Sequence, residues 1–423
     1  MWGKIYYSVI AALLVATAWA APHGGHTAEH HHHLHHGKDE PHPSHDGEDA
    51  CHLLAPHNAD FAFSLYKKFA FHPDAEGKNK NIFFSPVGIA MALSMLAVGA
   101  KGSTLSQIYS SLGYSGLQAS QVNESYEHLI HMLGHSQEDM QLEAGAGVAI
   151  REGFKVVDQF LKDVQHYYNS EAFSVDFSKP EIAAEEINKF IAKKTHDKIT
   201  NMVKDLDSDM VMMLINYMYF RGKWDKQFDA KLTHKADFKV DNDTTVQVDM
   251  MKRTGRYAFY QDPVNQTTVM MVPYKGNVSM MIVLPDEGKM KEVEESICRH
   301  QLKIWHDNLF NSSVDLFMPK FSITATSILN DILQDMGMTD AFSDTADFSG
   351  MTEEVKVKVS RVDHQAVLSV DEKGTEAVSV TTIEIMPISL PDTVMLNRPF
   401  LVLIVEDTTK SILFMGKITN PTE

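Results

Sequence analysis

The residues that say most about chemistry lie near the C-terminus, in the segment 371–400. From 374 to 389 it has no Lys or Arg, only two charged side chains and no hairpin-turn signal. Alternate side chains of a strand point to opposite faces, and one face here would hold only uncharged residues: Thr375, Ala377, Ser379, Thr381, Ile383 and Ile385. Pro387 and Pro391 indicate an exposed, irregular far end. This pattern predicts a loop that can insert into a sheet, the alternative being an ordinary surface loop before a C-terminal hairpin.

Motifs of enzymatic chemistry are missing from the sequence. The chain has no G-x-S-x-G, H-E-x-x-H, Walker or C-x-x-C motif. Outside the N-terminal tail the histidines are scattered, and none precedes a nucleophile in a recognisable frame. We therefore expect a protein that is not an enzyme and that needs no cofactor.

Length and charge bound the class of protein. The 423 residues, 44% of them hydrophobic, can bury a large core in one large domain or in two or three average ones. Residues 1–20 contain Lys4, an apolar run and an Ala18-Trp19-Ala20 cleavage pattern, which predicts a signal peptide and secretion to an extracellular, plasma-like compartment. Without that segment the net charge is −19, from 37 basic and 56 acidic residues, so we expect no nonspecific binding to nucleic acid or membrane.

Secretion is compatible with two further features. Acceptor sequons for N-glycosylation begin at Asn123, Asn242, Asn265, Asn277 and Asn311. The two cysteines, Cys51 and Cys298, can pair in an oxidising compartment. Their elements look unrelated, so two free thiols are the favoured interpretation.

Residues 21–50 form a histidine-rich segment. Ten histidines occur there with Gly, Pro, Asp and Glu, and this composition predicts a disordered tail. Neutral imidazoles suit Zn²⁺, Cu²⁺ or Ni²⁺, which makes a metal site one hypothesis for His30, His31, His32, His33, His35 and His36. A solvated tail with incidental metal affinity is the other.

Periodicity and capping signals predict an α+β fold. Ser85 and Pro86 read as the N-cap and first turn of a buried helix over 87–98. A helical pattern begins near Asn58, and a second one runs over 326–336 with Gly337 as its stop signal. Strands are predicted mostly in the second half, at 214–220, 269–273, 278–284, 314–318, 366–370, 400–405 and 411–415.

Short motifs in a fixed order give the chain a close resemblance to the serpin family over about residues 52–422. They read NIFFSP at 81–86, GAKGST at 99–104, NYMYFRGKW at 216–224, PYKGN at 273–277, LPDEG at 284–288, MPKF at 318–321, FSGM at 348–351, EKGTEA at 372–377 and NRPF at 397–400. The resemblance implies a single large domain at 51–423, with several helices, a large central mixed sheet, smaller antiparallel sheets and an exposed reactive loop at 372–391.

The resemblance also implies roles for particular residues. The bond between Ile388 and Ser389 would be the bait bond, and Glu372, Gly374, Thr375, Ala377 and Ser379 would form the hinge that inserts. Ser85, Asn216 and His364 match the gate that controls opening of the sheet, although satisfied buried polar groups are the plainer interpretation. Gly88 departs from the usual Ser, and the missing hydroxyl would loosen the gate by about 1 kcal/mol. Lys320 and Glu372 match an ion pair at the loop base.

The expected activity is that of a monomeric suicide inhibitor of serine proteases. Ile388 is β-branched and no basic residue occurs between Lys373 and Arg398, which favours an elastase-type target. Met386 is a possible second cut site. No Lys or Arg lies between Lys101 and Arg151, so no heparin requirement is expected. The alternative is a non-inhibitory member that carries a small hydrophobic ligand or hormone.

Overall fold

The computed structural model describes residues 46–72, 80–135, 140–372 and 390–423, with the side chains of 46–51 and 135 excepted. The chain from Ser44 onward forms one compact unit. Over these ranges no helix has the length and apolar character needed to span a bilayer.

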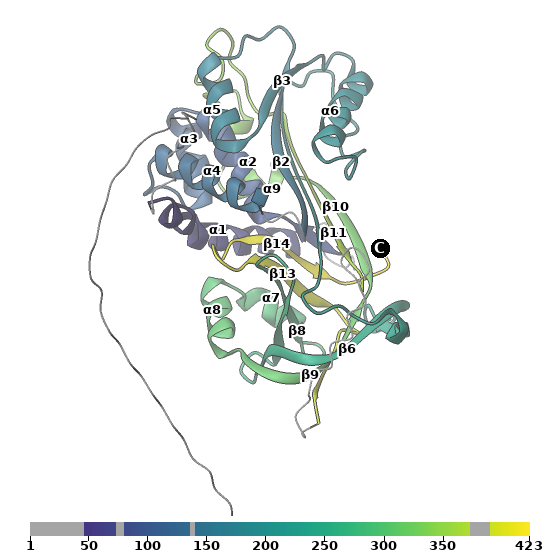
Figure 1. Ribbon diagram of the computed structural model, residues 1–423. Helices are drawn as coiled ribbons and strands as arrows, with labels where there is room; N and C mark the ends of the chain where they lie inside the picture. The colour runs from purple at the N-terminus through teal and green to yellow at the C-terminus, as the bar shows by residue number, and fades with distance from the viewer. Residues whose placement is uncertain (1–45, 73–79, 136–139, 373–389) are drawn as a thin grey trace, which may run out of the picture. The chain divides into compact units, whose positions relative to one another are not determined.

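A five-stranded mixed sheet runs through this unit, with helices beside it (Figure 1). Its strand order is β10 (Phe321–Ile328), β11 (Arg361–Val370), β4 (Met212–Gly222), β2 (Met140–Arg151) and β3 (Glu171–Val175). Neighbours β10 and β11 are antiparallel, as are β4 and β2, whereas β11 runs parallel to β4 and β2 parallel to β3. Two parallel strands therefore meet inside the sheet.

A nine-stranded sheet completes the β-structure. Its path is β1 (Ile82–Phe84), β14 (Ile412–Ile418), β13 (Phe400–Glu406), β8 (Val278–Pro285), β7 (Thr267–Pro273), β6 (Thr245–Asp262), β9 (Phe310–Pro319) and β12 (Asp392–Met395), and β5 (His234–Lys239) pairs with β6. All of these pairings are antiparallel except that of β12 with β9. The C-terminal end of the reactive loop thus continues as a strand at the edge of this sheet.

The helices flank the sheets on both sides. They are α1 (Asp46–Ala70), α2 (Pro86–Val98), α3 (Gly102–Leu112), α4 (Ala119–His135), α5 (Asp158–Tyr168), α6 (Pro180–Lys194), α7 (Met290–Ser296), α8 (Arg299–Asn308) and α9 (Asn330–Asp335), with 3₁₀ turns at Ala230–Leu232 and Asp340–Phe342. Figure 1 shows α6 on one side of the five-stranded sheet and α2, α4 and α5 on the other.

Strand β4 is buried on both faces, which explains its lack of polar alternation. Met212, Leu214, Met218 and Phe220 belong to the main core, which also contains α2. The alternate residues Met213, Ile215, Tyr217 and Tyr219 belong to a second core beneath α6. The strand therefore lies between two layers of helices.

Most elements expected from the sequence are confirmed. All seven predicted strands occur, and the helix at 87–98 is present as α2, with Ser85 Oγ accepting from the Gly88 amide at the N-cap. The prediction of a helix over 326–336 is wrong at its start. Residues 326–328 belong to β10, and the helix α9 begins only at Asn330. Ile328 is 56% exposed, so it does not share a buried helical face with Ile332.

We predict that Gly416→Ala destabilises the fold. A Cβ at Gly416 on β14 would overlap the Ile82 carbonyl oxygen and come within 2.8 Å of Phe83 Cδ2. Because the nearest atom is backbone, relief requires strand movement, with an expected loss of about 1–3 kcal/mol. A lower melting temperature is the expected result. Gly134→Ala on α4 is the control, since nothing lies within 4 Å of its added Cβ, and equal melting temperatures for the two variants would contradict the prediction.

Candidate functional site

The seam between the parallel strands β4 and β11 is the first component of the site. The strands pair at eight positions, from Arg361 with Met213 to Leu368 with Phe220. Strand β11 ends at Val370, and only Asp371 and Glu372 separate it from the segment 373–389. A chain that reversed after Val370 and entered the seam would run antiparallel to both neighbours. It would replace one parallel pairing by two antiparallel ones, which are slightly more stable per residue.

A chain of hydrogen bonds crosses this seam. His364 on β11 and Asn216 on β4 are register partners, and His364 Nδ1 donates to Asn216 Oδ1 at 2.7 Å. The Ser85 amide, at the start of α2, donates to His364 Nε2 at 3.0 Å. Asn216 Nδ2 donates to the Gly145 carbonyl on β2 at 2.9 Å. The three residues expected at the gate are therefore brought together, and they link α2 to three strands.

The bonding pattern fixes the protonation state of His364. Nε2 accepts from an amide and so carries no proton, which leaves the proton on Nδ1. The side chain is fully buried, and this desolvation lowers the pKa of His364 to about 3 from 6.5. The imidazole is therefore neutral near pH 7, and a second proton on Nε2 would break the bond to Ser85.

The network is complete without a side chain at position 88. The Gly88 amide donates to Ser85 Oγ at 3.0 Å, and that hydroxyl donates to Met218 Sδ at 2.9 Å. A Cβ at Gly88 would lie 2.9 Å from Ser85 Oγ and 3.0 Å from Asn216 Oδ1. Ser85 and Asn216 therefore pack directly against the glycine and leave little room for a side chain. The absence of a hydroxyl at position 88 therefore leaves no polar group of Ser85 or Asn216 unpaired, and the expected loosening of the gate has no missing hydrogen bond to explain it.

The base of the reactive loop is the second component. Glu372 is only 8% exposed, and its Oε2 lies 3.0 Å from Lys320 Nζ. Its Oε1 accepts from Thr233 Oγ1 at 2.8 Å. Burial alone would raise the pKa of Glu372, but the hydrogen bonds from Lys320 and Thr233 outweigh burial, and the pKa is lowered. The two residues expected to pair at the loop base are in contact, with a carboxylate that is buried and ionised.

Sequence reasoning missed a second set of contacts at the loop base. Arg221 Nη2, near the end of β4, lies 2.8 Å from Asp371 Oδ2. Trp224 Nε1 donates to the Asp371 carbonyl at 2.8 Å, and the Trp224 ring stacks on Tyr274 with centroids 4.1 Å apart. The usable signal was the position of Asp371, directly before Glu372. Asp371 and Glu372, the last described residues before the hinge, are therefore both held by contacts with the body of the protein.

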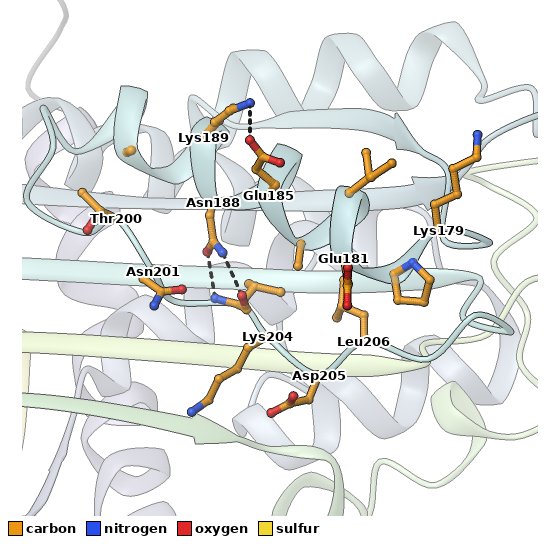
Figure 2. Close-up of a pocket in the computed structure, with 15 residues that line it drawn as sticks. Lys179, Glu181, Glu185, Asn188, Lys189, Thr200, Asn201, Lys204, Asp205 and Leu206 are labelled. Atoms are coloured by element: carbon orange, nitrogen blue, oxygen red, sulfur yellow. Dashed lines mark hydrogen bonds and ion pairs between the residues drawn. The ribbon is translucent and has the colours of Figure 1, made fainter.

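The opposite face of the seam is covered by α6 and the segment that follows it. Asn188 fastens this segment to the helix, because its Nδ2 donates to the Val203 carbonyl at 2.7 Å and its Oδ1 accepts from the Met202 and Val203 amides at 3.0 and 2.8 Å. Asn188 lies beside a hollow between α6 and residues 200–206 (Figure 2). The volume of this hollow is about 950 Å³. Since Tyr217 and Val367 lie in the core beneath α6, a strand that enters the seam has to pass under this cover.

A smaller cavity of about 410 Å³ lies among α1, α8 and strands of the nine-stranded sheet. Its apolar lining includes Pro56 from α1, Leu302 from α8, and Met271, Met281 and Val405 from the strands. This volume is within the range of small-molecule sites. No sequence pattern indicated this cavity, because the lining residues come from distant parts of the chain.

The structure separates the five sequons by the state of their asparagine side chains. Asn123 Oδ1 accepts from Tyr168 Oη at 2.7 Å, and Asn265 Nδ2 donates to Asp262 Oδ2 at 2.6 Å. Asn277 Nδ2 donates to Glu406 Oε1 at 3.0 Å. Asn242 and Asn311 are exposed and make no side-chain hydrogen bond within the described residues. Glycosylation itself remains a prediction at all five.

Several expected site residues lie outside the described residues. They are Gly374, Thr375, Ala377, Ser379, Ile388 and Ser389 in the loop, and His30, His31, His32, His33, His35 and His36 in the tail. Cys298 is a free thiol, and the side chain of Cys51 is not among those described. The described part of the chain contains no group of three His, Cys, Asp or Glu residues that could hold a metal ion.

Three features can be compared with known protein families. They are the parallel pairing of β4 with β11, the hydrogen bonds of His364 across that pairing, and the buried contacts of Glu372 before the segment 373–389. The model of the serpin family, whose description is serine protease inhibitor, matches residues 56–421 of the chain. The chain belongs to the serpin family.

Among similar proteins, the alpha-1-antitrypsin homolog of Cyprinus carpio is 84% identical over 341 residues, covering 81% of this chain and 92% of that one. The alpha-1-antiproteinase of Bos taurus is 43% identical over 89% of this chain and 90% of its own. Human thyroxine-binding globulin complexed with thyroxine matches the fold with a TM-score of 0.83 at 39% identity, over 88% of this chain and 100% of that one. The antitrypsin-like relatives support a protease inhibitor, a class that is not catalytic.

The lowered pKa of His364 makes stability depend on pH in a defined window. The unfolded chain takes up a proton near pH 6.5 and the folded chain only near pH 3, so the contribution is complete above about pH 6.5 and is lost as the pH falls toward 3. We predict a loss of up to about 1.4 kcal/mol per pH unit within this window. Melting temperatures of the wild type and His364→Gln between pH 7 and 5 check this.

His364→Gln should show a shallower pH slope than the wild type, whereas His300→Gln, which replaces an exposed histidine on α8, should keep the wild-type slope. Identical slopes for the wild type and His364→Gln would show that the neutral, buried imidazole does not control this transition.

Proposed function

We propose that the protein is a secreted, monomeric suicide inhibitor of elastase-type serine proteases, attacked at the bond between Ile388 and Ser389. The observation that carries this proposal is the β4–β11 seam. A segment that follows β11 and is patterned as a half-buried strand lies next in the chain to a parallel pair of strands, and it could fold back and insert between them once they separate. The similarity to antitrypsin-like relatives supports the same conclusion.

The chemical step belongs to the protease. Its catalytic serine attacks the Ile388 carbonyl, the bond to Ser389 breaks, and Ile388 remains bound to the protease as an acyl ester. If the freed loop enters the seam before water hydrolyses this ester, the protease moves with it. Residues 374–388 number fifteen and span roughly 50 Å when extended. The protease is then carried across the body of the inhibitor and its active site is distorted.

Insertion has to break the network at the seam. Neighbouring strands lie about 4.8 Å apart, and a strand between β4 and β11 would double the distance between His364 and Asn216. The bond of 2.7 Å between them cannot survive this separation. Ser85, Asn216 and His364 therefore act as a latch that keeps the sheet closed until the loop is cut.

The bait residue selects the protease through the shape of the primary pocket. No Lys or Arg occurs between Lys373 and Arg398, so the acidic primary pocket of a trypsin-like enzyme has no basic side chain to bind there. Deep chymotrypsin-type slots suit aromatic rings better than the branched Ile388 side chain. A shallow apolar pocket of the elastase type accepts it. Helix α4 contains no Lys or Arg, so the proposed activity needs no heparin.

We predict that incubation with an elastase-type protease gives a complex that survives SDS. Trypsin- and chymotrypsin-type enzymes should form this complex more slowly. Mass spectrometry of the released C-terminal peptide should find Ser389 as its first residue. A peptide that begins elsewhere, for example after Met386, rejects Ile388 as the bait residue.

We predict that Thr375→Arg converts the inhibitor into a substrate. Thr375 is on the face of the hinge that would enter the sheet, and burial of an unpaired guanidinium costs several kcal/mol. The variant should be cut at the bait bond and release active protease, as measured by residual protease activity. Glu376→Arg, on the alternate face, is the matched control and should still trap. Equal trapping by both variants would show that loop insertion is not the mechanism.

A second candidate function is the carriage of a small hydrophobic ligand. The apolar cavity among α1, α8 and the nine-stranded sheet favours it, and a similar solved serpin was crystallised with thyroxine. We predict that a carrier would bind thyroxine with a dissociation constant below about 1 µM, and that Met281→Trp would fill the cavity and abolish binding. Fluorescence titration measures this, and binding weaker than about 100 µM for the wild type excludes thyroxine carriage.

A further inference from the structure

Asn242 and Asn311 differ from the other three sequon asparagines. Both are exposed, and neither side chain makes a hydrogen bond within the described residues. A glycan on either one requires no existing contact to be rearranged, whereas the amides of Asn123, Asn265 and Asn277 are already engaged. The structure thus favours these two positions for modification. Of the two, only Asn311 lies close to the end of the reactive loop.

Asn311 stands beside the C-terminal stem of the reactive loop. It is the second residue of β9, whose Val314 is the register partner of Asp392 at the start of β12. The two strands are parallel, so residues before Val314 and residues before Asp392 extend toward the same end of the sheet. Asn311 lies roughly 10 Å before Val314, and Leu390 roughly 7 Å before Asp392.

Two further observations place the sequon at the stem. Ser312 Oγ donates to Asp392 Oδ2 at 3.1 Å, so the residue after Asn311 touches the stem directly. Leu390 is 95% exposed and comes second after the bait residue Ile388. A protease that holds residues on both sides of the bait bond therefore approaches the edge of the sheet where Asn311 lies.

We propose that an N-linked glycan on Asn311 regulates access of proteases to the bait bond, slowing association from the side of Leu390. The proposal rests on the proposed function, because it concerns the same loop. A glycan is bulky and hydrated, and its attachment point is within about 10 Å of the stem. It restricts which proteases can dock while leaving the seam, the latch and the hinge unchanged.

Asn242 provides a matched control. It lies in the turn between β5 and β6, where the neighbouring Lys239 amide donates to the Asn397 carbonyl at 2.8 Å. Asn397 is seven residues beyond Leu390, roughly 20 Å along the chain. A glycan on Asn242 is therefore on the same sheet but away from the stem.

The experiment uses the full chain secreted from a glycosylating host. Mass spectrometry after enzymatic deglycosylation first reports whether Asn311 carries a glycan. Association rate constants with pancreatic elastase are then compared for the wild type, Asn311→Gln and Asn242→Gln. We expect a rise of about threefold or more for Asn311→Gln and no change for Asn242→Gln, with the same stoichiometry of inhibition. An unmodified Asn311, or equal rates for all three proteins, overturns the proposal.

A second measurement separates this proposal from the proposed function. Papain cuts exposed loops by a different nucleophile and needs no trapping step, so its rate of cleavage in 373–390 reports access alone. Faster cleavage of Asn311→Gln than of the wild type supports the glycan proposal even if no serine protease is trapped. Normal trapping by all three proteins with unchanged papain cleavage rejects the glycan proposal and leaves the inhibitor function standing.

Discussion

The fold depends on one parallel strand pairing that is held in place by side chains. Parallel pairing of β4 and β11 is slightly less stable per residue than an antiparallel alternative, and in the mechanism we propose the segment 373–389 of the same chain would supply that alternative. Two side-chain hydrogen bonds add to this pairing: His364 is bonded to Asn216 across the seam, and the Ser85 amide at the start of α2 is bonded to His364. The energetic preference of the sheet and the geometry of its side chains thus oppose each other.

The buried polar groups at the seam illustrate how such an opposition is sustained. A buried imidazole is costly when its nitrogens lack partners, but here both nitrogens are satisfied and the ring stays neutral. The loop base uses a different device, a buried carboxylate that is stabilised by Lys320 and Thr233. The hydrogen-bonded His364 is neutral, whereas the paired Glu372 is charged. Added salt should therefore weaken the contact of Glu372 with Lys320 more than the hydrogen bonds of His364.

The sequence predicted those elements whose signals are local. The cap at Ser85, the apolar run of α2 and the seven strands were all recognisable, because capping and periodicity are read within a few residues. Residues 326–328 were misassigned because Ile328 fits helical spacing with Ile332, although it ends an exposed part of β10. Relations between distant residues, such as the hydrogen bond of Trp224 to Asp371 or the shared lining of one cavity by Pro56 and Met281, leave no local pattern. The family resemblance supplied the pairing of Lys320 with Glu372, which no periodicity could have given.

The two ends of the reactive loop are both anchored at strand β9. Lys320, directly after its last residue, holds the N-terminal stem through Glu372, and Val314 near its start holds the C-terminal stem through Asp392. These anchors are six residues apart in the chain, roughly 20 Å in a strand, whereas the seventeen residues 373–389 can span roughly 55 Å. The loop is therefore much longer than the gap it bridges. The two anchors therefore place no tight limit on the length of this segment, and residues could be gained or lost within 373–389 during evolution without changing the contact of Lys320 with Glu372 or the pairing of Val314 with Asp392.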